Sequence, residues 1–487
     1  MYLGLDLGTS GLKALLIDES QTVIASANAG LTVSRPHHGW SEQSPADWIA
    51  AAETAIGTLR QSHPKALAAL RGIGLSGQMH GATLLDDADR VLRPSILWND
   101  TRSHAQAARL DADPRFRAIT GNIVFPGFTA PKLVWIQENE PEIFGKVHRV
   151  LLPKDYLRLW LTGEYVSDMS DAAGTAWLDT GGRQWSPELL AATDLDESRM
   201  PALVEGTQPS GSLRAELAQK WGMESTVIVA GGGGDNAVSA CGVGIVRPGH
   251  AFVSLGTSGV LFASNAAYTP KPESAVHTFC HAVPGMWHQM GVILSAADAL
   301  NWHARVSGRT AVELTDELGD DLRAPGSALF LPYLSGERTP YNDADIRGAF
   351  IGLEQQSDRP ALTQAVLEGV SFAIRDCNEA LHAAGTTIDR VIAIGGGSRS
   401  RYWLSSLATA LDIAVDLPED GEFGAAFGAA RLGLIAATGA DPFAVCTLPA
   451  IERSIEPDAW LREAYDAAYD RYRRLYPALK SLQSAPG

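Results

Sequence analysis

The sequence Leu7-Gly8-Thr9-Ser10-Gly11 occurs a second time in the chain, as Leu255-Gly256-Thr257-Ser258-Gly259. Each copy interrupts a run of apolar residues, which predicts a β-hairpin with a short polar turn. Glycine lets such a turn approach a ligand closely, and exposed backbone N–H groups and hydroxyls can bind phosphate. Two such hairpins, about half the chain apart, predict two related domains that hold one nucleotide from both sides.

Length and composition limit the kind of protein that this chain can be. It has 487 residues, 45% of them hydrophobic and 20% charged, which is typical of a globular protein of two domains. We place the boundary just before the second hairpin, between domains of residues 1–246 and 247–487. The formal net charge of −17 argues against nucleic acid or an anionic membrane as a partner.

Nothing in the sequence indicates export or a disulfide framework. The first residues lack the features of a signal peptide, and no stretch is apolar for long enough to span a bilayer, so we expect a cytoplasmic protein. The four cysteines are widely scattered, which favours reduced thiols buried in the core.

Strand-like and helix-like stretches alternate along the chain, which predicts an α/β fold with helices covering the sheets. Apolar strands run into glycine turns at residues 231–234 and 395–397, and each turn precedes a helix. Because each half then holds a hairpin and a later strand–glycine–helix turn, we expect an internal duplication. The stretch after Pro457 predicts a packed terminal helix, which could pack across the domain boundary.

The first hairpin carries charged residues on both sides of its turn. Asp6 precedes the turn, where a carboxylate either holds a hydrated Mg²⁺ for a polyphosphate or merely hydrogen-bonds the turn. Lys13 follows it and is either a point charge for a transferring phosphoryl group or an exposed strand lysine. We expect Gly8, Thr9 and Ser10 to meet the phosphates.

The second half contains the remaining residues of the predicted nucleotide site. Gly256 and Thr257 are expected to contact the phosphates from the other side. Gly396 and Gly397 would let an adenosine lie against the backbone, with Ser400 in the same turn.

Asp235 follows four glycines and is expected to begin a helix. Its carboxylate could cap that helix and complement the helix dipole. It could instead accept the proton of a substrate hydroxyl during phosphoryl transfer, and we favour this role because the glycines bring backbone and acid to one point. Asn236 is expected to contact a polyol, with helix capping as the alternative.

A second group of polar residues follows other strands. Gln78, Met79 and His80 come at a predicted strand end, where α/β proteins bind ligands, although a lone histidine is more often structural. Trp98 could form an apolar wall for the carbon face of a sugar, with Asn99 beside it for the hydroxyls. Core packing is the alternative for Trp98.

In this order, these residues resemble the FGGY carbohydrate kinases, which have the actin/hexokinase/heat-shock ATPase fold. The resemblance runs from the first hairpin through residues 127–135 to the glycine turn at 395–397, and so covers nearly the whole chain. Further likenesses to the family lie at residues 77–81, 97–100, 152–156 and 167–175. The resemblance implies a duplicated, ribonuclease H-like fold with an interdomain cleft.

The resemblance also implies a reaction, namely ATP-dependent phosphorylation of D-xylulose to D-xylulose 5-phosphate with Mg²⁺. The family's catalytic base falls on Asp235, its metal-organising acid on Asp6, and its sugar-binding pair on Met79 and His80. One departure is the fourth glycine before Asp235, where three are expected. Another kinase of the family, for ribulose or glycerol, and a non-catalytic actin-like nucleotide switch remain alternatives, and a homodimer is left open.

Overall fold

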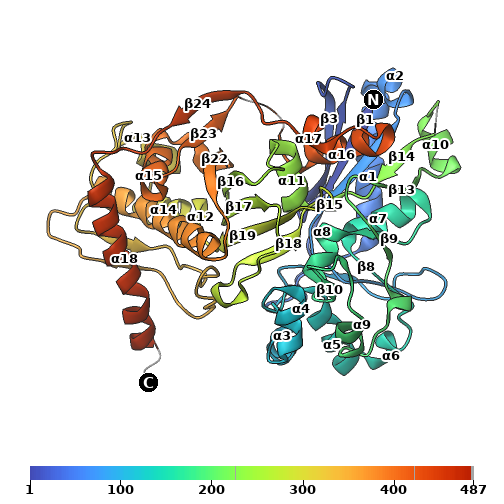
Figure 1. Ribbon diagram of the computed structural model, residues 1–487, viewed down its shortest axis with the longest axis horizontal. Helices are drawn as coiled ribbons and strands as arrows, with labels where there is room; N and C mark the ends of the chain where they lie inside the picture. The colour runs from blue at the N-terminus through green and yellow to red at the C-terminus, as the bar shows by residue number, and fades with distance from the viewer. Residues whose placement is uncertain (225, 420, 422, 484–487) are drawn as a thin grey trace.

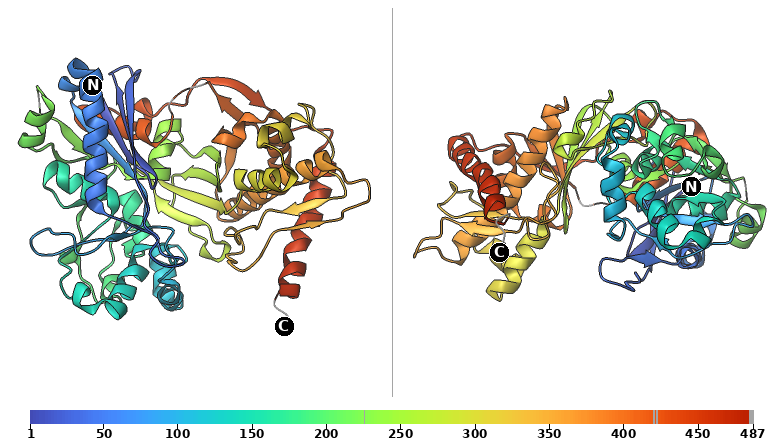
Figure 2. Two further views of the ribbon diagram at one scale, coloured as in Figure 1. Left: turned by 180° about the vertical axis from the view of Figure 1, so that it is seen from behind. Right: turned by 90° about the horizontal axis from the view of Figure 1, so that it is seen from below.

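Both copies of the repeated sequence join the two strands of a hairpin, and each hairpin lies within its own seven-stranded sheet. The computed structural model describes residues 1–224, 226–419, 421 and 423–483. Figure 1 shows the two sheets in two lobes, and Figure 2 shows the same lobes from behind and from below. Each sheet has its own apolar core, which includes Leu5 and Ile73 in the first lobe and Val253 and Leu261 in the second.

The first sheet has the order β13-β14-β5-β1-β2-β3, and β15 pairs with β5 beyond β14. Its strands are β1 (Tyr2–Leu7), β2 (Gly11–Ile17), β3 (Val23–Gly30), β5 (Gly72–Gly77), β13 (Pro209–Ser212), β14 (Ile228–Ala230) and β15 (Gly233–Gly234). The second sheet has the order β18-β19-β17-β16-β22-β23-β24. Its strands are β16 (Gly249–Leu255), β17 (Gly259–Asn265), β18 (His277–Cys280), β19 (Trp287–Ile293), β22 (Ile388–Ile394), β23 (Val415–Pro418) and β24 (Ile451–Ile455).

The two sheets repeat one topology. The strands β3-β2-β1-β5-β14-β13 correspond in order to β19-β17-β16-β22-β23-β24. Each pair of neighbours has the same relative direction in both sheets: two antiparallel pairs, two parallel pairs and a final antiparallel pair. The internal duplication expected from the sequence is therefore present in the backbone.

The two glycine turns, which the sequence suggested as a further sign of the duplication, are not counterparts in the structure. The glycine turn at 231–234 follows β14, whereas the turn at 395–397 follows β22, whose counterpart is β5. The two glycine turns therefore occupy different positions of the repeated sheet. Glycine occurs at each because the backbone there adopts a positive φ, 70° at Gly232 and 91° at Gly395, and the two lobes need this at different strand ends.

The longer helices are α1 (Pro45–Ser62), α5 (Thr129–Asn139), α7 (Pro153–Thr162), α11 (Asp235–Val243), α12 (Ala297–Ser307), α14 (Arg359–Ala383), α15 (Arg401–Leu411), α16 (Ala425–Thr438) and α18 (Arg462–Gln483). They pack either on strands of the two sheets or, as α5, α12 and α18 do, mainly on other helices. The terminal helix α18 packs on α14 and α15 in the second lobe and buries Tyr465, Ala468 and Tyr472. All four cysteines are buried and free. Among the described helices, none has both the length and the apolar character needed to cross a membrane.

Helix α16 crosses from the second half of the chain to the first sheet. It packs on β1, β5, β14 and α11. Figure 1 shows it beside α11 and β1. A Cβ atom on Gly4 would lie 1.8 Å from the Ala426 carbonyl oxygen, and one on Gly74 would lie 1.7 Å from that of Ala429. The helix therefore rests directly on the backbone of the strands that lead into the site described next.

Candidate active site

Asp6 lies near the end of β1, between β2 and β5. It is paired with Lys13 on β2 and with Ser76 on β5. The hydroxyl of Ser76 donates a hydrogen bond to Asp6 Oδ1 at 2.9 Å. Burial raises the pKa of the Asp6 carboxyl, against smaller lowering effects from Ser76 and Lys13.

Asp235 is brought toward Asp6 by β15. Gly233 on β15 pairs with Ser76, the residue that hydrogen-bonds Asp6, and α11 begins directly afterwards at Asp235. The backbone N–H and Nδ2 of Asn236 both donate to Asp235 Oδ1, at 2.8 and 3.0 Å. Burial, and then the negative charge of Asp6, raises the pKa of Asp235 to about 6. A carboxyl group with this pKa is ionised at pH 7 yet more basic than an ordinary aspartate, as general-base catalysis requires.

The two acids also have the chemistry of a cation site. Carboxylate oxygens are the hard ligands that Mg²⁺ prefers. Burial is the largest effect on the pKa of both carboxyl groups, and it disfavours their charged forms unless a cation is bound beside them. The residues present therefore fit a divalent cation at Asp6.

A chain of hydrogen bonds joins the first hairpin to two of the residues expected at the sugar. Thr9 Oγ1 donates to Gln78 Oε1 at 3.1 Å and accepts from Trp98 Nε1 at 2.9 Å. Gln43, which the sequence did not single out, donates to the Thr9 carbonyl oxygen at 2.7 Å and accepts from Gln78 Nε2 at 3.0 Å. Trp98 keeps 48% of its surface exposed, so the core alternative for this residue was wrong.

His80 has a conformation and a tautomer that its surroundings determine. Its φ is 70°, its ring stacks on Phe128 with centroids 4.7 Å apart, and its Nδ1 lies 2.7 Å from the Gly174 carbonyl oxygen. Burial lowers the pKa of His80 to about 3, so the ring is neutral at pH 7. Because a carbonyl only accepts, Nδ1 carries the hydrogen and Nε2 is left as a hydrogen-bond acceptor.

The backbone of His80 is held by the segment at 127–135. Lys132 Nζ lies 2.7 Å from the His80 carbonyl oxygen and 2.8 Å from that of Gly127, and Thr129 Oγ1 donates to the His80 carbonyl at 3.1 Å. Burial lowers the pKa of Lys132 well below its ordinary value. Sequence reasoning found this segment through the family resemblance alone and missed the role of the lysine.

The other predicted residues of the first lobe are placed as follows. Met79 touches the glycine turn, because a Cβ atom on Gly234 would lie 2.8 Å from Met79 Sδ. Asn99 Oδ1 is buried and has no hydrogen-bond partner among the described residues. Gly8 and Ser10 form the hairpin turn itself, where the Gly8 N–H donates to the Gly11 carbonyl at 3.0 Å and Ser10 is exposed.

The second lobe contains a cavity of about 610 Å³ between α12, α13 (Ala311–Asp316) and α15. Gly396, Gly397 and Ser400 line it, so the structure brings together these three predicted nucleotide residues. Apolar walls such as Leu300 complete a space of the size that a small ligand occupies. Ser400 also caps α15, since its hydroxyl accepts from the Trp403 N–H at 3.3 Å.

Gly256 and Thr257 lie at the turn of the second hairpin, next to this cavity. Their carbonyl oxygens accept from the N–H groups of Ala297 and Ala296 at the start of α12, at 2.8 and 2.9 Å. A Cβ atom on Gly397 would lie 2.7 Å from Leu255 Cβ, so the glycine turn abuts the end of β16. The hairpin and the cavity thus adjoin in the second lobe.

The duplicated sheet with a hairpin in each half is the architecture of the actin/hexokinase-like ATPases, and two acids in one lobe with a nucleoside-sized cavity in the other suit a kinase of that class. Models of the FGGY family of carbohydrate kinases match both halves, the N-terminal domain at residues 1–242 and the C-terminal domain at residues 251–437. The chain therefore belongs to the FGGY family of carbohydrate kinases, and its substrates are ATP and a sugar.

Three known proteins show how far the likeness extends. The chain is 49% identical over 490 residues to the xylulose kinase of Escherichia coli K12, covering 99% of this chain and 100% of that one. The crystal structure of a xylulose kinase from Brucella ovis is 70% identical, with a TM-score of 0.98 over 99% of both chains. A glycerol kinase from Plasmodium falciparum, with ADP, has a TM-score of 0.89 over 97% of both chains and 18% identity, which shows the fold alone.

Proposed function

We propose that the chain transfers the γ-phosphoryl group of ATP to the terminal hydroxyl of D-xylulose, giving D-xylulose 5-phosphate and ADP. The substrate is supported by the likeness to xylulose kinases over nearly the whole chain. The observation that carries the reaction is Asp235, a carboxyl group with a pKa of about 6 that the charge of Asp6 influences and that follows the glycine turn touched by Met79.

Asp235 is the general base of the proposed mechanism. It accepts the proton of the sugar hydroxyl as that oxygen attacks the γ-phosphorus and the bond to ADP breaks. Both bonds from Asn236 end on Oδ1, so we assign the proton to Oδ2. Because the base must be ionised, activity falls as the pH drops through about 6.

Asp6 is the residue that would hold Mg²⁺, with Ser76 fixing its carboxylate through Oδ1. When bound there, Mg²⁺ would supply positive charge that offsets the charge of the triphosphate. Lys13, opposite Asp6 on β2, adds a positive charge on the same side.

Contacts to the two substrates divide between the lobes. In the domain of residues 1–246, Met79, His80, Trp98, Asn99 and Asn236 contact the sugar, and His80 Nε2 accepts a hydrogen bond from a sugar hydroxyl. Gln78 acts there by orienting Thr9.

In the domain of residues 247–487, Gly396, Gly397 and Ser400 enclose the adenosine in their cavity. Gly256 and Thr257 approach the triphosphate from this side, and Gly8, Thr9 and Ser10 from the other. The cytoplasmic location and the homodimer remain predictions.

The test is a substrate comparison with the purified protein. ATP consumption is measured with D-xylulose, D-ribulose, L-ribulose and glycerol offered separately, and D-xylulose should give the largest kcat/KM. A preference for another polyol would support the kinase activity but contradict the assignment of D-xylulose as the substrate. ATP hydrolysis that no sugar stimulates, together with nucleotide-dependent assembly, would indicate an actin-like switch instead.

A further inference from the structure

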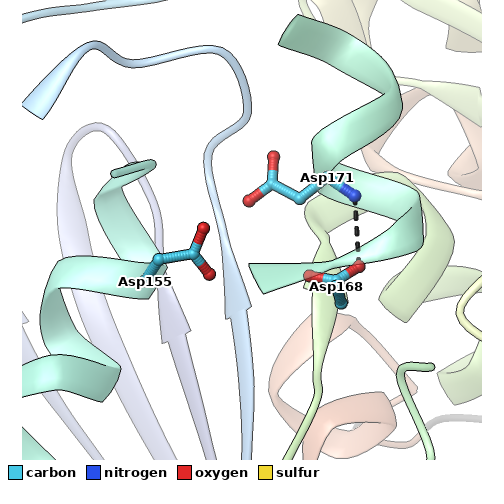
Figure 3. Close-up of side chains that lie close together, drawn as sticks. All are labelled: Asp155, Asp168 and Asp171. Atoms are coloured by element: carbon cyan, nitrogen blue, oxygen red, sulfur yellow. Dashed lines mark hydrogen bonds between the residues drawn. The ribbon is translucent and has the colours of Figure 1, made fainter. Parts of the chain in front are cut away.

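A cluster of buried charges lies next to the glycine turn that carries Asp235. Asp155 belongs to α7, whereas Asp168 and Asp171 stand at the start of α8 (Met169–Ala172). Figure 3 shows the three side chains close together, with Asp155 approaching from one helix and the other two from the second. All three are fully buried, and each offers an oxygen within 4.8 Å of the others.

The three acids surround a lysine instead of forming a free metal site. Lys154 Nζ lies 2.7 Å from Asp155, 2.6 Å from Asp168 and 2.9 Å from Asp171. Burial alone would lower the pKa of Lys154, but the three carboxylates raise it, so the ammonium group stays charged. Burial raises the pKa of Asp171 well above its ordinary value.

This cluster extends to the start of the glycine turn through Arg158, one helical turn after Asp155. Its Nη2 lies 3.6 Å from Asp155 Oδ1. The same guanidinium donates to the carbonyl oxygens of Ala230 and Gly231, at 2.6 and 2.5 Å. Arg158 therefore joins the buried acids to the end of β14 and to the first glycine of the turn.

Ser170 makes the matching contact at the end of the turn. Its fully buried hydroxyl accepts from the Gly234 N–H at 3.1 Å and donates to Asp168 Oδ1 at 2.6 Å. A Cβ atom on Gly233 would lie 2.7 Å from Ser170 Oγ, so the serine lies directly against the turn. Both ends of residues 231–234 are thus bonded to side chains that the Lys154 cluster holds.

We propose that Ser170 and Arg158 are positioning residues for phosphoryl transfer, which hold the glycine turn so that the Asp235 carboxylate stays beside Asp6. Glycine has the greatest backbone freedom of any residue, so the bonds to this turn, those of Ser170 and Arg158 among them, limit the positions that the acid can take. Misplacing a catalytic group by about 1 Å can lower a rate about 10²-fold. The inference rests on the proposed role of Asp235 as the base.

The test compares Ser170→Ala with Ser371→Ala. Ser371 in α14 is equally buried and also donates a hydrogen bond within the protein, to the Leu367 carbonyl at 2.9 Å, but lies in the other lobe. Circular dichroism and thermal unfolding establish that both variants fold. The steady-state kinetics with ATP and D-xylulose are then measured from pH 5 to pH 8.

For Ser170→Ala we expect kcat to fall at least about tenfold while KM for ATP stays within about twofold, because the nucleotide cavity is in the other lobe. In the pH profile of kcat, the acid limb should also shift to lower pH than in the unchanged enzyme. The reason is that a loosened turn exposes the Asp235 carboxyl to water, which lowers its pKa. Ser371→Ala should leave kcat and the acid limb of its pH profile unchanged.

Equal kinetics and pH profiles in the two serine variants would overturn the inference. Asp235→Asn, measured in parallel, separates this outcome from a failure of the proposed function. If Asp235→Asn is inactive while Ser170→Ala resembles Ser371→Ala, the positioning role alone is wrong. If Asp235→Asn retains full activity, the proposed base is wrong and the positioning role fails with it.

Discussion

The two hairpins share five residues in sequence but differ in what stands around them. Asp6 precedes the first turn, and Ser254 takes the same place before the second. The register also differs, because the first hairpin pairs Leu7 with Leu12 and the second pairs Leu255 with Gly259, so that the first turn is longer by one residue. As a result Asp6 faces Lys13, whereas Ser254 faces Val260.

This difference separates what the duplicated backbone does from what the side chains add. Hydrogen bonding between strands and burial of apolar faces are needed equally in both lobes, and both sheets have one topology. The residues at the strand ends contribute less to that packing and can diverge. The first lobe carries the two acids, and the second carries the nucleoside-sized cavity.

The largest effect should come from removing the base in the first lobe. Asp235→Asn keeps the size of the side chain but cannot accept the hydroxyl proton, so kcat should fall about 10²-fold or more. KM for ATP should change little. Turnover close to that of the unchanged enzyme would remove Asp235 from this role.

The comparison of the hairpins predicts unequal effects at two equivalent positions. Asp6→Asn should lower kcat about 10²-fold and change its dependence on Mg²⁺ concentration, because Asp6 would hold the ion. Ser254→Ala should change kcat by less than about threefold. Rates are measured over a Mg²⁺ titration for both variants. Equal losses, or an Asp6→Asn rate that does not respond to the metal, would show that the two hairpins do the same work.

A change in the second lobe should act on nucleotide binding alone. Ala311→Trp places an indole in the cavity that Gly396 and Gly397 line, and it should raise KM for ATP about tenfold while leaving KM for D-xylulose unchanged. Ala383→Trp, at an exposed helical alanine of the same lobe, is the control. A raised KM for the sugar, or an unchanged KM for ATP, would argue against this division between the lobes.

The smallest effect is on the stability of the folded protein, which the ionised, buried Asp235 lowers. The folded-state pKa of Asp235, about 6, lies above its ordinary value of 3.8, so ionisation of this carboxyl destabilises the folded protein as the pH rises through that range. Asp235→Asn cannot ionise and should be more stable than the unchanged protein at pH 7.5, by at most about 3 kcal/mol. Below about pH 4 the gain should vanish. Thermal unfolding at both pH values measures it, and a loss of stability at pH 7.5 would contradict the stated pKa.

Local pattern was sufficient to predict the hairpins, the strands before the glycine turns and the helix that begins at Asp235. Each depends on residues close together in sequence, where alternation, glycine and helix-start signals are informative. The same reasoning misjudged the two glycine turns as counterparts, because a strand's place in a sheet depends on distant partners.

The residues that hold the site could not be found in this way. Ser170 bonds the N–H of Gly234, 64 residues away, and Lys132 bonds the carbonyl of His80, 52 residues away. No periodic pattern connects residues so far apart. The contact of α16 with Gly4 and Gly74 is hidden for the same reason, although glycines inside a strand are a signal of close backbone approach.

A crystal structure with D-xylulose and a non-hydrolysable ATP analogue tests the central claim most directly, through the distance from the Asp235 carboxylate to the terminal oxygen of the sugar. The account predicts hydrogen-bond contact, about 2.6–3.2 Å, with the γ-phosphorus on the far side of that oxygen. A sugar whose terminal hydroxyl lies well beyond that reach, with another side chain in contact with it, would contradict the account.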